Sequence, residues 1–207
     1  MPVDTLREVK KSKMAIAGLV IISLFVLVAV FAPFIAPHDP LEQNITQRLS
    51  PPSIEYPFGT DDFGRCVLSR VIYGTRISLL IAIAIVSITT AIGIVLGMIS
   101  GFYGGIIDEL IMRSVDFNIA FPGLILAIVL ASILGPGFLS LIVALSVTGW
   151  TEYARVIRGS VLSVKEKEFV EAAKAIGLSD LCIMFQHVLP NVIAPVIPLA
   201  VLRTGLT

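Results

Sequence analysis

Charged residues are scarce in this sequence. Asp, Glu, Lys and Arg make up 14% of the 207 residues, against about 25% in a typical soluble domain. Hydrophobic residues make up 56%, and the mean hydropathy is +0.95. A soluble chain of this size cannot bury that much apolar surface without leaving a large exposed patch. The composition therefore excludes disordered and collagen-like chains and predicts an integral membrane protein.

Cysteine and histidine are equally rare, with two of each, at Cys66, Cys182, His38 and His187. Two cysteines make no disulfide framework, and no C-x-x-C, H-x-x-x-H or Ser/His/Asp arrangement is present. The chain has no P-loop pattern, so we expect it to hold no ATP, cofactor or metal and to be no enzyme. The 15 basic and 15 acidic residues balance, which argues against nucleic-acid binding.

Long uncharged runs locate the membrane spans, because about 20 helical residues cross the hydrocarbon core. The third run is too long for one helix, and Gly135-Pro136-Gly137 inside it predicts a turn between two helices. We therefore expect an all-α, polytopic membrane helical bundle with about five spans. Its expected parts are a cytoplasmic tail over 1–13, a first helix over 14–37, an outer loop with an amphipathic helix over 38–76, and a permease core over 77–207. Within the core we expect helices over 77–101, 110–134 and 138–158, a coupling loop over 159–189, and a last helix over 190–207.

The distribution of Lys and Arg predicts the orientation. With the N-terminus in the cytoplasm, the inner segments hold ten of these residues and the segment 38–76 holds four. A cleaved signal peptide is the alternative for the first run. Its apolar core would be about 7–15 residues, followed by an A-x-A-like site. The run 14–37 is longer and no such site follows it, which favours an uncleaved helix.

Three glycines in the second helix, Gly93, Gly97 and Gly101, are spaced four apart and share one face. Two overlapping G-x-x-x-G patterns allow another helix backbone to approach closely. The sequence leaves open whether that helix belongs to this chain or to a partner subunit.

The polar stretch 160–190 predicts a helix, a glycine corner and a second short helix. Ser163 and Glu166 fit a capping box, Gly177 is expected to end the first helix in a left-handed conformation, and Ser179 to cap the second helix. The apolar face is expected to be mainly alanine, which favours docking into a protein groove over lying on lipid headgroups. Its expected members are Phe169, Ala172, Ala173 and Ile176.

This stretch resembles a known family. Glu171-Ala172-Ala173, then Gly177, then Leu189-Pro190 are similar to the E-A-A…G…L-P motif of membrane subunits of binding-protein-dependent ABC importers. The residues from His187 to Asn191 look like the peptide and nickel branch. The resemblance implies a coupling helix that seats in a cleft of a cytoplasmic ATPase. It implies a charged contact for Glu171, close approach for the two alanines and a corner at Gly177.

A second stretch, residues 58–79, is similar to the segment before the second helix in the second permease type of dipeptide, oligopeptide and nickel importers. Cys66 departs from that pattern, in which Asp is common at this position. We expect Gly59 and Gly64 to bracket a turn, Asp61 or Asp62 to cap the following helix, and that helix to lie along the outer membrane face near the gate. A headgroup anchor is the alternative. The expected outer-face residues are Gly59, Thr60, Asp61, Gly64, Arg65, Ser69, Arg70, Tyr73, Gly74 and Arg76.

A charged cluster lies at the inner end of the third expected helix and holds Asp108, Glu109, Arg113 and Asp116. These charges are either solvated at the interface or paired with the ATPase or a partner permease. Arg203 falls within the last expected span, where a charge is costly.

The resemblance runs from about residue 13 to residue 200 and implies a type I ABC importer permease in the inner membrane. It implies a translocation pathway for peptides or nickel and four kinds of partner: a second permease in a heterodimer, two ATPase subunits, an external solute-binding protein and the lipid bilayer. An ion-driven secondary carrier and a membrane-embedded enzyme are the alternatives, but the first four helices show no ionisable residue in mid-span and no convergent polar set. The sixth helix usual in the family is not seen, so we expect a fragment or a shortened form.

Overall fold

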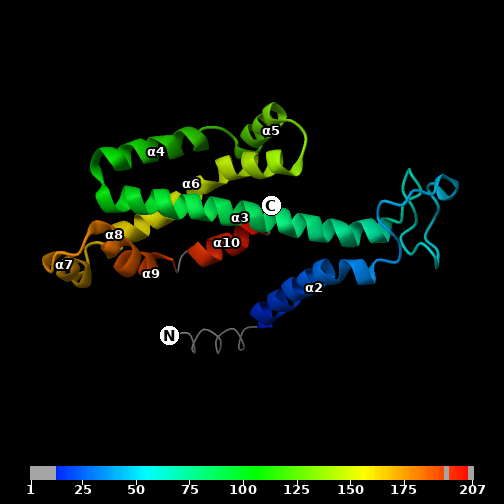
Figure 1. The fold of residues 1–207 in the computed structure, drawn as a ribbon, viewed down its shortest axis with the longest axis horizontal. Coiled ribbons are helices and arrows are strands. Elements are labelled where there is room, and N and C mark those ends of the chain that lie inside the picture. Colours follow the sequence, from blue (N-terminus) through cyan, green and yellow to red (C-terminus); the bar gives the residue numbers. More distant parts are fainter. Residues whose placement is uncertain (1–12, 194–195, 205–207) are drawn as a thin grey trace. The chain divides into compact units, whose positions relative to one another are not determined.

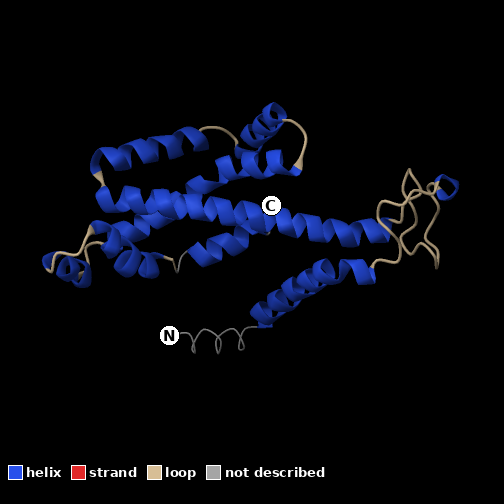
Figure 2. Ribbon diagram, viewed as in Figure 1, coloured by secondary structure: helices blue, strands red, loops and turns tan. Residues whose placement is uncertain are grey.

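A computed structural model describes residues 13–193 and 196–204 of the chain, and they form helices joined by turns (Figures 1 and 2). In this described part the only strand-like pairing is an isolated bridge between Thr60 and Cys66. The predicted all-α membrane fold is confirmed. The chain divides into two compact units, Met1–Leu80 and Ile81–Thr207, which are described separately below. The basic residues of the expected N-terminal tail up to residue 12 lie outside the described residues, and so does the side chain of Arg203.

The first unit begins with helix α2, Lys13–Ile35. Nearly all of its large apolar side chains are exposed, and Phe34 is 86% exposed, while the small residues Ala29 and Ala32 are buried. An exposed surface of this kind suits a helix surrounded by lipid. The helix ends two residues earlier than expected, just after Pro33.

Residues 38–66, here named the turn segment, connect α2 to the next long helix and contain only one short 3-10 helix, η1, Ile45–Gln47. Both predicted turn glycines adopt a positive φ of 71°. A β-carbon on Gly59 would lie 2.5 Å from the Ser50 carbonyl oxygen, and one on Gly64 would overlap the Asn44 carbonyl group. The chain therefore folds back on itself at two places where only glycine fits.

Helix α3, Val67–Tyr103, is a single helix of 37 residues. The expectation of a separate amphipathic helix, followed by a span that begins at residue 77, is therefore wrong. No proline interrupts the stretch, and Gly74 is helical with open space around the position that a β-carbon would take. Arg76 precedes the uncharged run that begins at residue 77, but the helix begins earlier, at Val67. At about 1.5 Å per residue, α3 is longer than one membrane crossing requires.

The helix expected over 110–134 is two helices, α4, Gly105–Ile119, and α5, Gly123–Leu134. They are bent by 90° across the break between them. Pro122 explains the break, because its ring and missing N–H prevent a continuous helix through this point. Helix α6, Phe138–Val164, follows the Gly135-Pro136-Gly137 turn, in which both glycines have positive φ.

Two described helices, α2 and α3, are long and apolar enough to cross a membrane, and a third span is possible if the bent pair α4–α5 counts as one. Helix α6 is long enough, but its second half carries Glu152, Arg155 and Arg158.

After α6 the chain forms short elements. They are α7, Glu168–Ala175, α8, Asp180–Cys182, a π-helical turn η2, Ile183–Val188, α9, Leu189–Val192, and α10, Val196–Thr204. The last helix expected over 190–207 is therefore divided into α9 and α10. We name residues 165–192 the short-helix segment.

The hydrophobic core of the second unit forms where this segment packs against α6. Its buried side chains come from α3, α6 and the elements that follow α6, and they include Met98, Tyr153, Ile157, Val161, Val164, Val170, Ala173, Ile183, Met184, Val188, Val192 and Val196. Burial of these apolar side chains fixes the short-helix segment on the end of α6.

Candidate functional site

Helices α3 and α6 pack closely along the three glycines of α3. A β-carbon on Gly97 would lie 2.6 Å from the Ala154 carbonyl oxygen, and one on Gly101 would lie 2.8 Å from the Val161 β-carbon. Gly93 faces Tyr153 in the same way. Of the two alternatives left open by the sequence, the structure shows packing within the chain. Any larger residue at these three positions would force the two helices apart.

The charges of α4 are paired with α6, which neither interpretation of the sequence foresaw. Arg158 donates from Nε and Nη2 to the two carboxylate oxygens of Asp108, at 2.5 and 2.6 Å. The hydroxyl of Ser100 donates to the same carboxylate. A fork-shaped guanidinium on a half-buried carboxylate is a strong and geometrically specific pair. It ties the start of α4 to the end of α6.

Three further contacts extend this cluster. Arg155 donates to Asp116 at 2.6 Å, again from α6 to α4. Within α4, Arg113 donates to Glu109 at 2.9 Å. Lys165, just after α6, donates from Nζ to the backbone carbonyl oxygen of Gly101 at 2.9 Å. Glu109 and Arg113 are an i,i+4 pair on one helix. The partners in the other two contacts lie 39 and 64 residues apart, so no local pattern in the sequence indicates them.

One face of helix α7 packs on the core, and another face is exposed at the surface of the chain. Val170 and Ala173 are buried, at 0% and 4% exposure. Glu171 and Ala172 are exposed, and Ile176 is 75% exposed. Of the four residues predicted for the apolar docking face, Phe169, Ala172 and Ile176 are exposed, and their docking stays a prediction. Ala173 packs inside this chain and is not available to a partner. Val170, which was not among the residues predicted for the apolar face, lies beside Ala173 on the buried face.

The ends of α7 follow the predictions only in part. Gly177 has a φ of 79°, and Leu178 N–H donates to the Ala173 carbonyl oxygen, so the predicted left-handed stop is confirmed. Ser179 accepts a hydrogen bond from Cys182 N–H at 3.4 Å, so the predicted cap is also confirmed. The capping box is wrong, because Ser163 lies inside α6, which continues to Val164 since Val161 and Val164 are buried.

Leu189 and Pro190 stand directly after the π-helical turn. Leu189 N–H donates to the Met184 carbonyl oxygen, five residues back. Pro190 has no N–H to donate, and a shift of hydrogen-bond register before it keeps the chain helical. Leu189 is half-buried on the core, and Pro190 is exposed. The Leu-Pro pair thus marks a change of helix type that was not predicted from the sequence.

Asp61 organises the turn segment in the first unit. Its Oδ1 accepts from Phe63 N–H at 2.8 Å and from Arg65 N–H at 3.0 Å, and its Oδ2 accepts from the side chains of Arg65 and Arg70. Burial raises the pKa of the Asp61 carboxyl, but the two backbone N–H donors and Arg65 outweigh burial and lower this pKa to about 2. Asp61 closes a turn and does not cap α3, which begins at Val67.

The other predicted outer-face residues divide between this turn and α3. Thr60 bonds to the backbone of Gln47 and Ser50 through its hydroxyl, and the buried hydroxyl of Ser69 accepts from His38 N–H at 3.0 Å. Tyr73, Gly74 and Arg76 lie within α3, where Tyr73 and Gly74 are half-buried and Arg76 is exposed.

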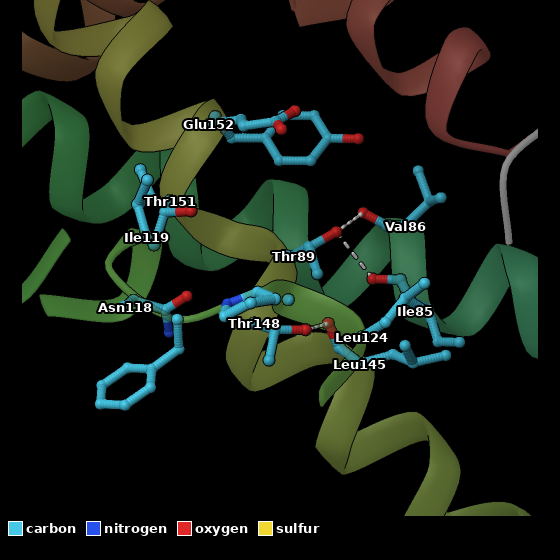
Figure 3. Close-up of a pocket in the computed structure, with 15 residues that line it drawn as sticks. Ile85, Val86, Thr89, Asn118, Ile119, Leu124, Leu145, Thr148, Thr151 and Glu152 are labelled. Atoms are coloured by element: carbon cyan, nitrogen blue, oxygen red, sulfur yellow. Dashed lines mark hydrogen bonds between the residues drawn. The ribbon is translucent and has the colours of Figure 1, made fainter. Parts of the chain in front are cut away.

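A pocket of about 550 Å³ opens beside the break between α4 and α5 (Figure 3). Sequence reasoning missed it, although two signals were present: Pro122-Gly123 inside an uncharged run, and polar residues at helical spacing on α6. Its lining comes from α3, α4, α5 and α6 and comprises Ile85, Val86, Thr89, Asn118, Ile119, Phe121, Pro122, Gly123, Leu124, Leu145, Thr148, Gly149, Thr151, Glu152 and Tyr153.

Comparison with known proteins places this chain in a family. Residues 93–207 match the family model of the binding-protein-dependent transport system inner membrane component. Residues 3–52 match that of the N-terminal TM domain of oligopeptide transport permease C. The chain belongs to the family of binding-protein-dependent transport system inner membrane components, which are transport permeases.

Similar proteins carry peptide-transport names. The chain is 42% identical over 202 residues to the dipeptide transport system permease protein DppC of Alkalihalophilus pseudofirmus, covering 98% of this chain and 66% of that protein. It is 40% identical to the DppC protein of Bacillus subtilis, covering 94% of this chain and 61% of that one. It is 38% identical to the oligopeptide transport system permease protein OppC of Bacillus subtilis, covering 94% and 64%. The chain thus spans between 61% and 66% of the lengths of these three relatives.

Proposed function

We propose that this chain is the membrane subunit of an ABC importer that carries short peptides across the inner membrane. In this proposal it forms the translocation pathway with a second permease subunit. Two cytoplasmic ATPase subunits drive transport, and an external solute-binding protein delivers the cargo. Membership of the family and relatives named as dipeptide and oligopeptide permeases support this proposal. The sequence also left nickel open as cargo, and that stays a prediction.

The observation that carries the proposal is the two-faced packing of α7. Its inner face is fixed by Val170 and Ala173 in the core, and Glu171 and Ala172 are exposed at the surface of the chain. A helix that passes motion between subunits needs both properties. It must contact its partner, and it must be attached firmly enough for a displacement to reach the rest of the molecule.

The path from α7 into the spanning region is continuous. The core joins α7 to the end of α6, the pair Asp108–Arg158 joins α6 to α4, and α4 ends at the pocket. Coupling needs contacts that differ between two states of the transporter. We propose that Glu171 makes such a contact with the ATPase, Ala172 allows close approach, and Gly177, Leu189 and Pro190 hold α7 in the required orientation.

The proposed topology places the N-terminus and the short-helix segment in the cytoplasm and the turn segment outside. The excess of Lys and Arg in the first two regions supports this orientation. In this arrangement the turn segment, held by Asp61, lies at the outer surface near the gate.

Co-purification tests the proposal. The chain is expressed with its neighbouring genes, tagged, and extracted in mild detergent, and bound ATPase activity is measured for wild type and Glu171→Lys. Glu166→Lys is the matched control, because it makes the same charge change at an exposed residue outside α7. We expect wild type and the control to retain the ATPase and Glu171→Lys to lose it. Retention by all three, or by none despite full membrane insertion, contradicts the proposed coupling contact.

A further inference from the structure

We propose that the ion pair Asp108–Arg158 is a latch. It holds α4 against α6 in this structure, and it opens during the transport cycle so that α4 turns about Gly104 and Gly105. The inference rests on the proposed function and adds to it the element that moves and the contact that controls it. All of the residues concerned belong to the second unit.

The connection between α3 and α4 has the features of a hinge. Gly104 and Gly105 are consecutive and have positive φ values of 67° and 56°. An added β-carbon on either would have no neighbouring atom within 4 Å. Helix α3 ends at Tyr103 and α4 begins at Gly105, so the chain changes direction at these two glycines. Their backbones can rotate at little steric cost, and no packed side chain at this turn opposes a change of angle.

Helix α4 is attached to α6 mainly by polar contacts. Within α4, which lies wholly in the described part of the chain, Val115 alone is buried. Besides the pair at Asp108, Arg155 donates to Asp116, and Asn118 donates to a backbone carbonyl oxygen of α6. Helices α3 and α6, in contrast, pack through buried apolar side chains and the three glycines of α3. Water can replace polar contacts at a small net cost, whereas exposing an apolar interface is costly. Helix α4 can therefore leave α6 more readily than α3 can.

The pair at Asp108 is the strongest of the polar contacts between α4 and α6. The side chains of Asp108 and Arg158 are 19% and 32% exposed, whereas those of Asp116 and Arg155 are 67% and 49% exposed. Ion pairs that water reaches less are stronger, and the fork-shaped contact of Arg158 adds a second charged hydrogen bond. The hydroxyl of Ser100, a fully buried residue of α3, donates to the same carboxylate. Asp108 therefore determines whether α4 stays on α6.

Helix α7 contacts both of the helices that hold Asp108. Its buried face shares the hydrophobic core with α6. On α3, the ammonium group of Lys174 lies 5.5 Å from the centre of the Phe102 ring. Lys165, between α6 and α7, donates to the Gly101 carbonyl oxygen at the end of α3. A displacement of α7 therefore reaches the ends of α3 and α6, where the two donors to the carboxylate lie. An ATPase that contacts α7 differently in its two states would then close or open the latch.

Reversible cross-linking of α4 to α6 tests whether the latch opens. Asp116→Cys and Arg155→Cys are combined in a Cys182→Ser background, in which the remaining Cys66 is buried. This exchange leaves the latch itself intact and removes only an exposed ion pair, which contributes little to stability. A short bis-methanethiosulfonate joins the two new cysteines, and reduction removes it.

The matched control combines Glu109→Cys with Arg113→Cys. It also removes one exposed ion pair and joins two cysteines, but both lie within α4. The full transporter is reconstituted in proteoliposomes for both variants. The rate of cross-link formation is measured without nucleotide and with ATP and vanadate. Uptake of L-alanyl-L-phenylalanine and ATP hydrolysis are measured before linking, after linking and after reduction.

We expect the link between α4 and α6 to stop dipeptide uptake, because α4 can no longer leave α6, and we expect reduction to restore uptake. The rate at which this link forms should differ between the two nucleotide states. The link within α4 should form at the same rate in both states and should leave uptake unchanged.

Asp108→Asn opens the latch with little change of shape, and Glu109→Gln makes the same charge change at the exposed neighbouring residue. Asp108→Asn should lower the maximal uptake per ATP hydrolysed about tenfold, because charged hydrogen bonds are lost. The dipeptide concentration at half-maximal uptake should stay the same, since the latch touches no cargo. Asp108→Glu, which keeps the charge, should retain most of the coupling, and Glu109→Gln should retain all of it.

Uptake at the unlinked rate while α4 is linked to α6, or link formation at equal rates in the two nucleotide states, overturns the latch and leaves the proposed function standing. Fully coupled uptake by Asp108→Asn also overturns it. If Asp108→Asn does not assemble, the cross-linking result decides, because it is obtained with the pair intact. A complex whose link formation depends on nucleotide, but which takes up no dipeptide even when unlinked, contradicts the proposed cargo and leaves the latch standing.

Discussion

The turn segment and the short-helix segment are both polar stretches between apolar helices, yet they are held in different ways. The turn segment relies on one carboxylate and on two glycines that let the backbone close on itself. Its large apolar residues are mostly exposed, and Ile54 is fully so. The short-helix segment is held by a buried apolar cluster that it shares with α6.

Each segment is therefore sensitive to a different perturbation. A structure held by hydrogen bonds to one carboxylate depends on charge and pH, whereas a packed core depends on volume. An apolar core also joins its parts mechanically, because close packing transmits displacement. This is the property that the proposed coupling role of α7 requires, and the turn segment has no comparable core.

Gly64→Ala should have the largest effect, and it should be confined to the turn segment. The new β-carbon would overlap the Asn44 carbonyl group, and alanine would also be strained at this positive φ. Because the overlap and the strain add, the free energy of unfolding of the turn segment should fall by more than about 4 kcal/mol. Limited proteolysis between residues 38 and 66 measures it. Gly74→Ala, helical and in open space, is the control and should not be cleaved faster. Equal resistance of both variants would show that the turn does not close as described.

Ile183→Ala should destabilise the short-helix segment by about 3 kcal/mol, because it leaves a cavity at a fully buried position. Thermal unfolding in detergent and proteolysis of residues 165–192 measure the change. Phe185→Ala removes more atoms from a side chain that is 59% exposed and should cost less than about 0.5 kcal/mol. A larger loss of stability for Phe185→Ala than for Ile183→Ala would show that the π-helical turn packs on the core with its opposite face, which contradicts the structure.

Asp61→Asn should destabilise only the turn segment, by about 1–3 kcal/mol at neutral pH, because hydrogen bonds to a charged group are lost. The folded pKa of Asp61 is about 2, lowered from 3.8. The carboxylate therefore contributes fully above about pH 4, and its contribution disappears as the pH falls toward 2.

Hydrogen exchange of peptides covering residues 56–65, compared between wild type and variant at each pH, checks this window. The difference between the two proteins should be large at pH 6 and vanish near pH 2. Asp62→Asn, whose carboxylate is 70% exposed and 3.8 Å from Arg48, is the control and should show little difference at any pH. A constant difference for Asp61→Asn across this range would mean that the carboxylate charge is not what holds the turn.

Ser179→Ala should have the smallest effect, about 0.5 kcal/mol, since its capping bond is long and exposed. The same thermal unfolding assay measures it. Ser163→Ala, inside α6, should cost nothing measurable despite the capping-box pattern around it. The reverse order would restore the capping box and contradict the continuation of α6 to Val164.

Features set by a few neighbouring residues could be predicted from the sequence. The turn bracketed by Gly59 and Gly64, the left-handed stop at Gly177 and the cap at Ser179 were predicted, because backbone freedom and side-chain hydrogen bonding act locally. The helix boundaries were less accurate. An uncharged run indicates which residues can lie in the membrane, but it does not fix where a helix begins or ends. Helix α3 begins before its uncharged run, and the helix expected over 110–134 breaks within such a run, at Pro122.

Features set by distant residues could not be predicted. The pairing of Asp108 with Arg158 joins positions 50 residues apart, and nothing in either neighbourhood indicates the other. The sequence did not show which face of α7 is buried within this chain, because Val170 and Phe169 are equally apolar and only the position of α6 decides between them. The pocket needs four helices together, so its polar residues looked unrelated along the chain.

The proposed coupling between ATP hydrolysis and transport depends on the orientation of α7, and Gly177→Val perturbs that orientation at a single position. The position has a φ of 79°, and an added β-carbon has no neighbouring atom within 4 Å, so valine acts there by straining the backbone at the end of α7. Gly159→Val, in open space within α6, is the control. ATP hydrolysis and dipeptide uptake are measured together in proteoliposomes of the full transporter. We expect Gly177→Val to hydrolyse ATP but take up little dipeptide, whereas the control does both. Uptake at the wild-type rate per ATP in Gly177→Val would contradict the coupling role of α7.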